Sequence, residues 1–177
     1  MKKIAYSLVA CLAVAGSALA GHEVKETKEY KQPEGVPCFK DTELQLDVFG
    51  TYNDTSAGGH TDGFGGGLAI NYFFMRYVGI GVDGNVFDGG HDGTWNFSGR
   101  LILRYPIELG GLCLAPYIFG GGGYETDGIN SGTEVAGGGL EFRIIPEKLG
   151  IFAEGSYTWV NASDDNRQAR IGVRFVF

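Results

Sequence analysis

The sequence has no hydrophobic run long enough for a membrane-spanning helix after its first 20 residues. Such a helix needs about 20 consecutive, mostly apolar residues, and the apolar stretches of residues 21–177 are all much shorter. Segments with apolar residues at the helical period over a useful length are missing as well. These two absences exclude a helical membrane span and direct attention to β-structure.

Basic charge is also scarce. The chain has 14 Lys and Arg residues against 21 Asp and Glu residues. Nucleic-acid binding is disfavoured by this balance, because contacts with phosphate groups need a basic surface. We therefore expect no nucleic-acid partner.

Signatures of enzyme chemistry are absent from the sequence. It has no phosphate-binding loop, no G-x-S-x-G nucleophile motif and no H-E-x-x-H zinc motif. The glycine runs 65–67, 120–123 and 137–139 lack the spacing of a nucleotide-binding motif, and close strand packing explains them better. We predict a protein that is not an enzyme and that has no cofactor.

The histidines of two polar stretches form the one candidate metal site. His60 lies near Asp62, and His91 lies between Asp88 and Asp92. Imidazole and carboxylate groups bind metals, but solvated polar loops account for the same residues without a ligand. The prediction is that no metal is bound here.

Residues 1–20 have the features of a cleaved secretory signal peptide. Two lysines precede an apolar run, and Ala18-Leu19-Ala20 is a small-x-small cleavage site. Removing the two lysines leaves 12 basic against 21 acidic residues, a net charge of −9. Residues 21–42 follow as a charged stretch with prolines, which we interpret as a flexible periplasmic N-terminal arm.

Two cysteines, Cys38 and Cys113, remain after cleavage. An even number of cysteines in an exported chain favours one disulfide, and two unpaired buried thiols are the alternative. A bond would hold the arm against the end of the folded domain.

After residue 42 the chain alternates between apolar and polar residues. A period of two is typical of a strand with one apolar and one polar face. Each segment has roughly the ten residues that a tilted transmembrane strand needs. We predict an all-β fold, a closed antiparallel eight-stranded transmembrane β-barrel over residues 43–177. The strands are expected at 43–52, 63–74, 77–87, 94–105, 112–124, 133–145, 150–160 and 168–177, and only 112–124 has no cleanly apolar face.

Charged residues within these segments occupy the polar parity. Because both signs occur, we predict an ion-pair network that fills the interior and leaves no open pore. Glu141 is expected opposite Glu154, and Glu154 opposite Arg174. Acid–base chemistry by the two glutamates is the alternative, which the neighbouring arginines disfavour. The predicted network is Asp47, Asp83, Arg100, Arg104, Glu141, Arg143, Glu154, Arg170 and Arg174.

The apolar parity is then expected to face lipid. A soluble barrel has its apolar residues inside and its charges outside. A soluble barrel built from this sequence would instead bury charges and expose an apolar belt to water. Aromatic residues near strand ends are expected to form girdles at the two membrane–water interfaces. These aromatic residues are Tyr52, Phe64, Phe74, Tyr77, Phe87, Trp95, Tyr105, Tyr157, Trp159 and Phe177.

The last strand resembles a known signal. Val173, Phe175 and Phe177 share its apolar parity, and this ending resembles the C-terminal strand of bacterial outer-membrane β-barrels. Residues 114–124 are similar to the Pro-Tyr, glycine-rich fifth strand of small eight-stranded barrels of the OmpA, OmpX and opacity-protein type. The resemblance implies export to the outer membrane of a Gram-negative bacterium, contact with its lipid, and recognition of the last strand by the barrel-assembly machinery.

The resemblance departs from the family in two respects. No peptidoglycan-binding domain follows Phe177, and the outward loops are short. We therefore expect a structural or surface-interaction role, with an external partner that the sequence does not identify. A soluble exported ligand-binding barrel and a lipid-modifying outer-membrane enzyme are the alternatives.

Overall fold

The computed structural model describes residues 37–55, 63–88, 93–126, 130–161 and 165–177. The predicted signal peptide, the arm up to residue 36, and His60, Asp62, His91 and Asp92 lie outside the described residues. Among the described residues, no helix is long and apolar enough to span a bilayer.

Nine strands make up the described part of the chain, and they form one sheet. Eight of them are long and the remaining one has only three residues. In chain order they are β1 (Glu43–Thr55), β2 (Gly63–Met75), β3 (Val78–Phe87), β4 (Thr94–Arg104), β5 (Ile107–Leu109), β6 (Leu112–Thr126), β7 (Asn130–Ile145), β8 (Leu149–Val160) and β9 (Asn166–Val176).

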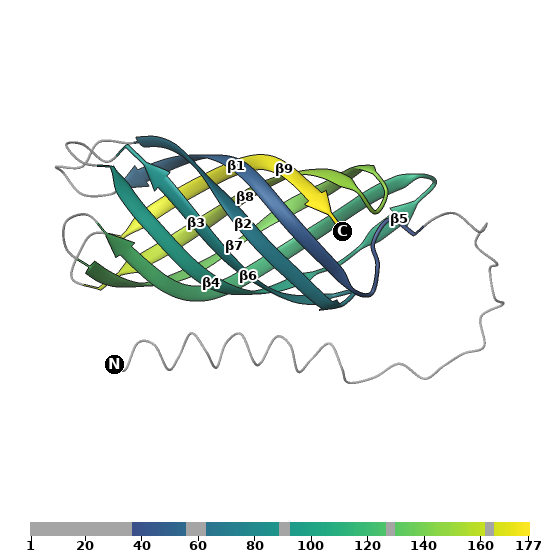
Figure 1. The fold of residues 1–177 in the computed structure, drawn as a ribbon, viewed down its shortest axis with the longest axis horizontal. Coiled ribbons are helices and arrows are strands. Elements are labelled where there is room, and N and C mark those ends of the chain that lie inside the picture. The colour runs from purple at the N-terminus through teal and green to yellow at the C-terminus, as the bar shows by residue number, and fades with distance from the viewer. Residues whose placement is uncertain (1–36, 56–62, 89–92, 127–129, 162–164) are drawn as a thin grey trace. The chain divides into compact units, whose positions relative to one another are not determined.

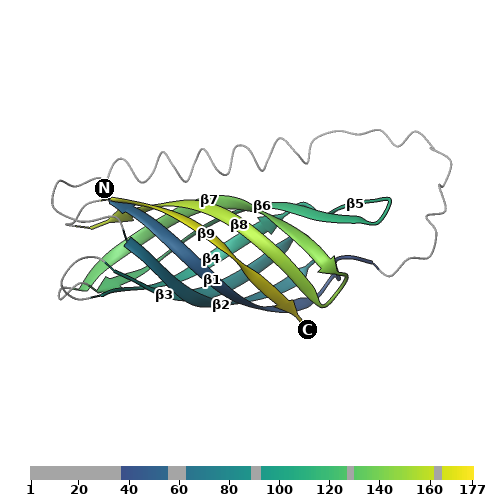
Figure 2. The same ribbon diagram turned by 90° about the horizontal axis from the view of Figure 1, so that it is seen from above.

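The sheet closes on itself (Figures 1 and 2). β1 pairs with β9, the last strand of the chain, and β4 pairs with β6. Every pairing is antiparallel, so the eight long strands form a continuous ring. Closure removes the unpaired strand edges that an open sheet would leave. The predicted all-β, closed, eight-stranded antiparallel barrel is confirmed.

The short strand β5 was not expected, because residues 106–111 have the composition of a turn. β5 pairs with the start of β6 through Ile107 and Leu114, and the hairpin turns at Gly110 and Gly111. Both glycines have positive φ, 57° and 92°, which suits a two-residue hairpin turn. Pro106 cannot donate a ladder hydrogen bond, so it separates β5 from β4. β5 therefore lengthens one hairpin and adds no strand to the ring.

The unassigned faces of the fifth predicted strand have a simple explanation. In β6 the inward side chains include Cys113, Ala115, Tyr117 and Phe119, all of them buried. The outward positions that alternate with them, such as Ile118, are apolar too. An apolar residue on both faces hides the period of two, and the parity of β6 becomes visible only when the barrel is closed.

The two ends of the barrel differ. β2 and β3, and likewise β7 and β8, are joined by short turns at one end, the turn end, where residues 37–42 also lie (Figure 1). The other end, the loop end, carries the connections between β1 and β2, β3 and β4, β6 and β7, and β8 and β9. At the turn end, Phe177 and Leu44 exchange backbone hydrogen bonds of 2.9 and 3.3 Å. The end of the described chain is thus joined to the first strand.

Glycine permits a close approach of β4 and β6. A Cβ atom added at Gly121 would lie 1.9 Å from the carbonyl oxygen of Gly99, and one at Gly123 would lie 1.9 Å from that of Phe97. No side chain fits at such distances, since the obstacle is backbone. By contrast, a Cβ at the adjacent Gly120 would be 3.8 Å from its nearest neighbour, the carbonyl oxygen of Val135.

Candidate functional site

The barrel interior contains ten buried charged side chains among the described residues, five acidic and five basic. The nine residues predicted from the sequence all lie there, and the tenth is Glu43. With Glu43 included, the formal charges of these ten buried side chains sum to zero. The buried acidic residues are Glu43, Asp47, Asp83, Glu141 and Glu154, and the buried basic residues are Arg100, Arg104, Arg143, Arg170 and Arg174.

Glu43 joins two arginines at the turn end. Its Oε2 atom accepts hydrogen bonds from Arg104 Nη1 at 2.6 Å and from Arg143 Nη2 at 2.9 Å. Its Oε1 atom accepts a bond of 2.7 Å from the backbone N–H of Lys40. These side chains are fully buried. The three donors therefore supply the hydrogen bonds that water would give to an exposed carboxylate.

A second group of charges continues the network toward the middle of the barrel. Arg143 Nε contacts Glu141, and Glu141 accepts a bond of 2.6 Å from Arg174 Nη1. Arg174 also donates from Nε and Nη2 to the two oxygens of Asp47, at 2.7 Å each. This two-point geometry is the strongest form of the arginine–carboxylate interaction.

A third group lies nearer the loop end. Arg100 and Arg170 both contact Glu154 Oε1, at 3.0 and 3.3 Å. Arg170 Nη2 also lies 2.9 Å from Asp83 Oδ2. The other oxygen of Glu154 accepts a hydrogen bond of 2.8 Å from the hydroxyl of Tyr117. Two arginines thus share two carboxylates.

Asn71 joins the groups into one network. Its Nδ2 atom donates to Asp47 at 2.8 Å, and its Oδ1 atom accepts a bond of 3.5 Å from Arg100. Three members of the network, Glu43, Asn71 and Tyr117, are not among the residues predicted from the sequence. Glu43 and Asn71 lie on the inward parity of their strands, so parity was the available signal. Tyr117 gave none, because the faces of its strand were unassigned.

Two predicted cross-strand pairs are wrong. Glu141 lies opposite Phe152, and Glu154 lies opposite Gly139 on one side and Arg170 on the other. The first register differs by two residues: one because Ile145 pairs with Leu149 at the turn, and one because of an irregularity in β7 between Arg143 and Ile145. In both hairpins the error is an even number of residues, so every side chain stays on its predicted face. The glutamates consequently bind arginines and not each other.

Aromatic side chains pack against the buried guanidinium groups. The guanidinium of Arg104 lies 3.8 Å from the ring centre of Phe73, and that of Arg174 lies 4.7 Å from Phe152. Such stacking stabilises a cation where water is excluded. Phe87, predicted for an interfacial girdle, is also interior, with 5% of its surface exposed. It shares the polar parity of β3, and its position near a strand end was a misleading guide.

The loop half of the interior is mostly polar and uncharged, but the half-buried carboxylate of Glu125 accepts hydrogen bonds of 3.4 Å from Asn96 and from Asn166. Asn53 and Gln168 are joined by a hydrogen bond of 2.6 Å from Gln168 Nε2 to Asn53 Oδ1. Thr51, Asn85 and Asn96 are buried in the same half. The charges are therefore concentrated in the turn half and the middle of the barrel.

Residues 38–40 close the turn end. Cys38 is bonded to Cys113 of β6, across 75 positions of sequence. Phe39 is 1% exposed, and the guanidinium groups of Arg104 and Arg143 lie 5.1 and 4.8 Å from its ring centre. The end of the predicted arm is thus part of the folded domain. It caps the arginine pair that Glu43 holds.

We expect the Cys38–Cys113 bond to add to the stability of the barrel. Cys113→Ser should lower the free energy of unfolding by about 2–4 kcal/mol, because the bond restricts a long loop of the unfolded chain. Urea unfolding of the protein folded in detergent micelles measures the change. A reductant should shift the unmodified protein toward the variant and leave the variant unchanged. Equal unfolding midpoints for the two oxidised proteins would contradict the expectation.

Comparisons with known proteins find similar structures but no similar sequence family. No protein-family model matches the sequence, and no curated protein matches it either. The N-terminal β-barrel domain of Pseudomonas aeruginosa OprF is similar in structure, with a TM-score of 0.58 and 20% identity over 76% of this chain and 97% of that one. Neisserial surface protein A is similar with a TM-score of 0.60 and 15% identity, over 78% of this chain and 98% of that one.

Ail, the attachment invasion locus protein of Yersinia pestis, is also similar, with a TM-score of 0.56 and 15% identity over 78% of this chain and all of that one. A structure of the same outer membrane protein in a phospholipid bilayer nanodisc matches with a TM-score of 0.51 and 13% identity. This chain therefore has the fold of the small eight-stranded outer-membrane β-barrels.

Proposed function

We propose that this chain is an integral outer-membrane protein of a Gram-negative bacterium, with a structural or surface-interaction role and no enzymatic activity. One observation carries the proposal: the described barrel has its apolar side chains outside and its charges inside. A barrel that is soluble in water requires the reverse arrangement. Such a barrel would also need an apolar interior to bind an apolar ligand.

The outer surface supports a location in lipid. Outward charges on the described long strands lie near their loop ends, at Asp54, Glu134 and Arg167, and toward the turn end charges lie in the connections, at Arg76, Glu147 and Lys148. Between them the outward residues form an apolar band, where a basic side chain would cost about 2–4 kcal/mol at the midplane. Exposed aromatic residues such as Trp95 and Tyr105 lie near strand ends, as expected at a membrane interface.

The filled interior supports a role other than a pore. Eight strands leave room for side chains only, and in the described part the charged network occupies that room. Ions would have to separate buried arginine–carboxylate pairs in order to pass. We propose that the folded barrel does not conduct.

The last strand supports recognition by the assembly machinery. Val173, Phe175 and Phe177 lie on the outward face at the β1–β9 seam, where they are exposed. A strand that completes the ring is the natural element for an insertion factor to hold until β1 and β9 pair. The likeness to Ail, whose name describes attachment, supports a surface-interaction role. We propose no particular partner for this chain.

Reconstitution tests the proposal. The mature protein should fold in detergent, migrate in gels at a position that changes on heating, and float with phosphatidylcholine vesicles in a density gradient. The same vesicles fused to a planar bilayer should show no conductance steps. Monodisperse folded protein in buffer without detergent would disprove the membrane assignment. Regular conductance steps would disprove only the closed interior.

A further inference from the structure

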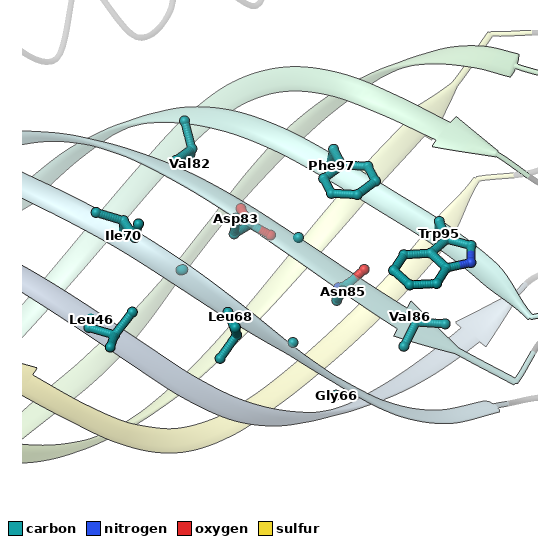
Figure 3. Close-up of a pocket in the computed structure, with 13 residues that line it drawn as sticks. Leu46, Gly66, Leu68, Ile70, Val82, Asp83, Asn85, Val86, Trp95 and Phe97 are labelled. Atoms are coloured by element: carbon teal, nitrogen blue, oxygen red, sulfur yellow. The ribbon is translucent and has the colours of Figure 1, made fainter.

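The outer wall of the barrel has an apolar groove across β2 and β3 (Figure 3). Its volume is about 510 Å³, within the range of about 300–1,000 Å³ that small-molecule sites occupy. Leu46, Ile70 and Val82 lie toward one end, and Val86 and Trp95 lie toward the other (Figure 3). The second end is near the loops, because β3 finishes and β4 begins there.

Glycine creates this groove. Gly66 pairs with Val86, and Leu68 pairs with Gly84, so the two glycines are diagonal neighbours on the outward face. Two adjacent positions on the wall therefore lack side chains, while apolar side chains surround them. The ring of Phe97, opposite Gly84 in the sheet, forms one wall.

The chemistry of the groove favours hydrocarbon. Asp83 and Asn85 border it with backbone only, since their side chains are buried in the interior. The side chains that face it, among them Leu68, Val82 and Phe97, are apolar. A lipid phosphate or a sugar would find no charged partner among these lining residues.

The shape of the groove disfavours a second barrel as the occupant. Two barrels are convex and touch along a narrow line, so neither can fill a hollow in the wall of the other. A flexible chain that lies along the strands can fill it. The groove runs from the middle of the apolar band to the loop end, which is the course of a lipid chain in one leaflet.

We propose that the groove between β2 and β3 binds one hydrocarbon chain of a membrane lipid, held by its shape and not by its headgroup. This inference rests on the proposed membrane location. The lipid chain prefers the groove over the rest of the barrel wall only because it packs more closely there. Elsewhere in the membrane the lipid chain is surrounded by hydrocarbon too. A modest selectivity is therefore expected.

The two tryptophans of the chain supply a probe and its control. Trp95 lines the groove, whereas Trp159 of β8 does not. Their exposed fractions are similar, 52% and 46%. Trp159→Phe leaves Trp95 as the single reporter, and Trp95→Phe leaves Trp159.

Fluorescence quenching tests the proposal. Each single-tryptophan protein is titrated in octyl glucoside micelles with phosphatidylcholine that carries dibrominated chains. Trp95 should reach half-quenching at a lipid mole fraction about threefold lower than Trp159, because the longer lipid chain displaces detergent from the groove. Brominated phosphatidylglycerol should give the same ratio.

A groove-filling variant completes the test. Val86→Phe should abolish the threefold difference, and Ile171→Phe, which adds the same ring to the outward face of β9, should preserve it. Equal half-quenching of the two tryptophans, or a ratio that depends on the headgroup, would overturn the proposal. Shielding of Trp95 in a dimer would overturn it in favour of a second copy. Failure to quench either tryptophan would instead refute the membrane location.

Discussion

Glu43→Gln is expected to destabilise the barrel by about 3–5 kcal/mol, the cost of leaving a buried charge without its partner. The substitution removes the charge that Arg104 and Arg143 share and leaves four buried acidic side chains against five buried basic ones. Glutamine keeps the shape of the side chain, so the loss is electrostatic. Urea unfolding in detergent micelles measures it.

Glu108→Gln is the matched control. Glu108 binds Arg76 at 2.6 Å, the same distance that separates Glu43 from Arg104. The Arg76 and Glu108 side chains are 32% and 22% exposed, whereas those of Arg104 and Glu43 are both 0% exposed. A partly exposed pair contributes about 0–1 kcal/mol. Similar losses for Glu43→Gln and Glu108→Gln would show that the interior charges are hydrated and not coupled.

A second substitution separates charge balance from local packing. Glu43→Gln combined with Arg143→Met restores equal numbers of buried acidic and basic side chains, because it removes one charge of each sign. The double variant should be more stable than Glu43→Gln alone, since apolar replacement of a buried ion pair is often neutral or favourable. A double variant with additive losses would argue that the network acts only through its individual contacts.

Gly121→Ala is expected to have the second large effect, a loss of about 3 kcal/mol or failure to close the barrel. The added Cβ would meet the backbone of β4 at 1.9 Å, and the neighbouring strand has no flexible side chain to move aside. The seam between β4 and β6 would have to separate. The ratio of folded to unfolded protein after refolding into micelles, read from heat-modifiable migration, reports the effect.

Gly120→Ala controls for the loss of glycine as such. Its Cβ would have an ordinary contact of 3.8 Å, and alanine restricts the unfolded chain more than glycine does. The expected change in stability is therefore close to zero or slightly favourable. If the two alanine variants folded equally well, the proposed close approach of β4 and β6 would be wrong.

Local patterns in the sequence predict the faces of most strands. The alternation of Asp47, Asp83 and Arg174 with apolar neighbours gave their faces, and seven of the eight long strands could be assigned faces in this way. The even shifts of register at Glu141 and Glu154 did no harm to that assignment. The exception was β6, where Tyr117 and Phe119 made the inward face as apolar as the outward one.

The predicted position of a side chain is wrong or missing where residue type or place in the chain, and not strand parity, is used to predict it. Phe87 is aromatic and near a strand end, which predicts a girdle position, although its parity on β3 points inward and the side chain is buried. Glu43 stands at the first position of its strand, next to the predicted arm, and is not among the nine residues of the predicted network. In both cases strand geometry decided the position of the side chain more strongly than residue type did.

The sequence by itself determined that the chain forms strands, how many long ones it forms, and which side of most of them carries charge. These properties follow from a repeat of two residues, which each segment displays without reference to any other. The tertiary structure alone decided which charges meet, how Glu43 balances the interior, where Phe39 lies, and where missing side chains leave a groove. Those properties depend on register and closure, which bring together residues as distant in sequence as Asp47 and Arg174.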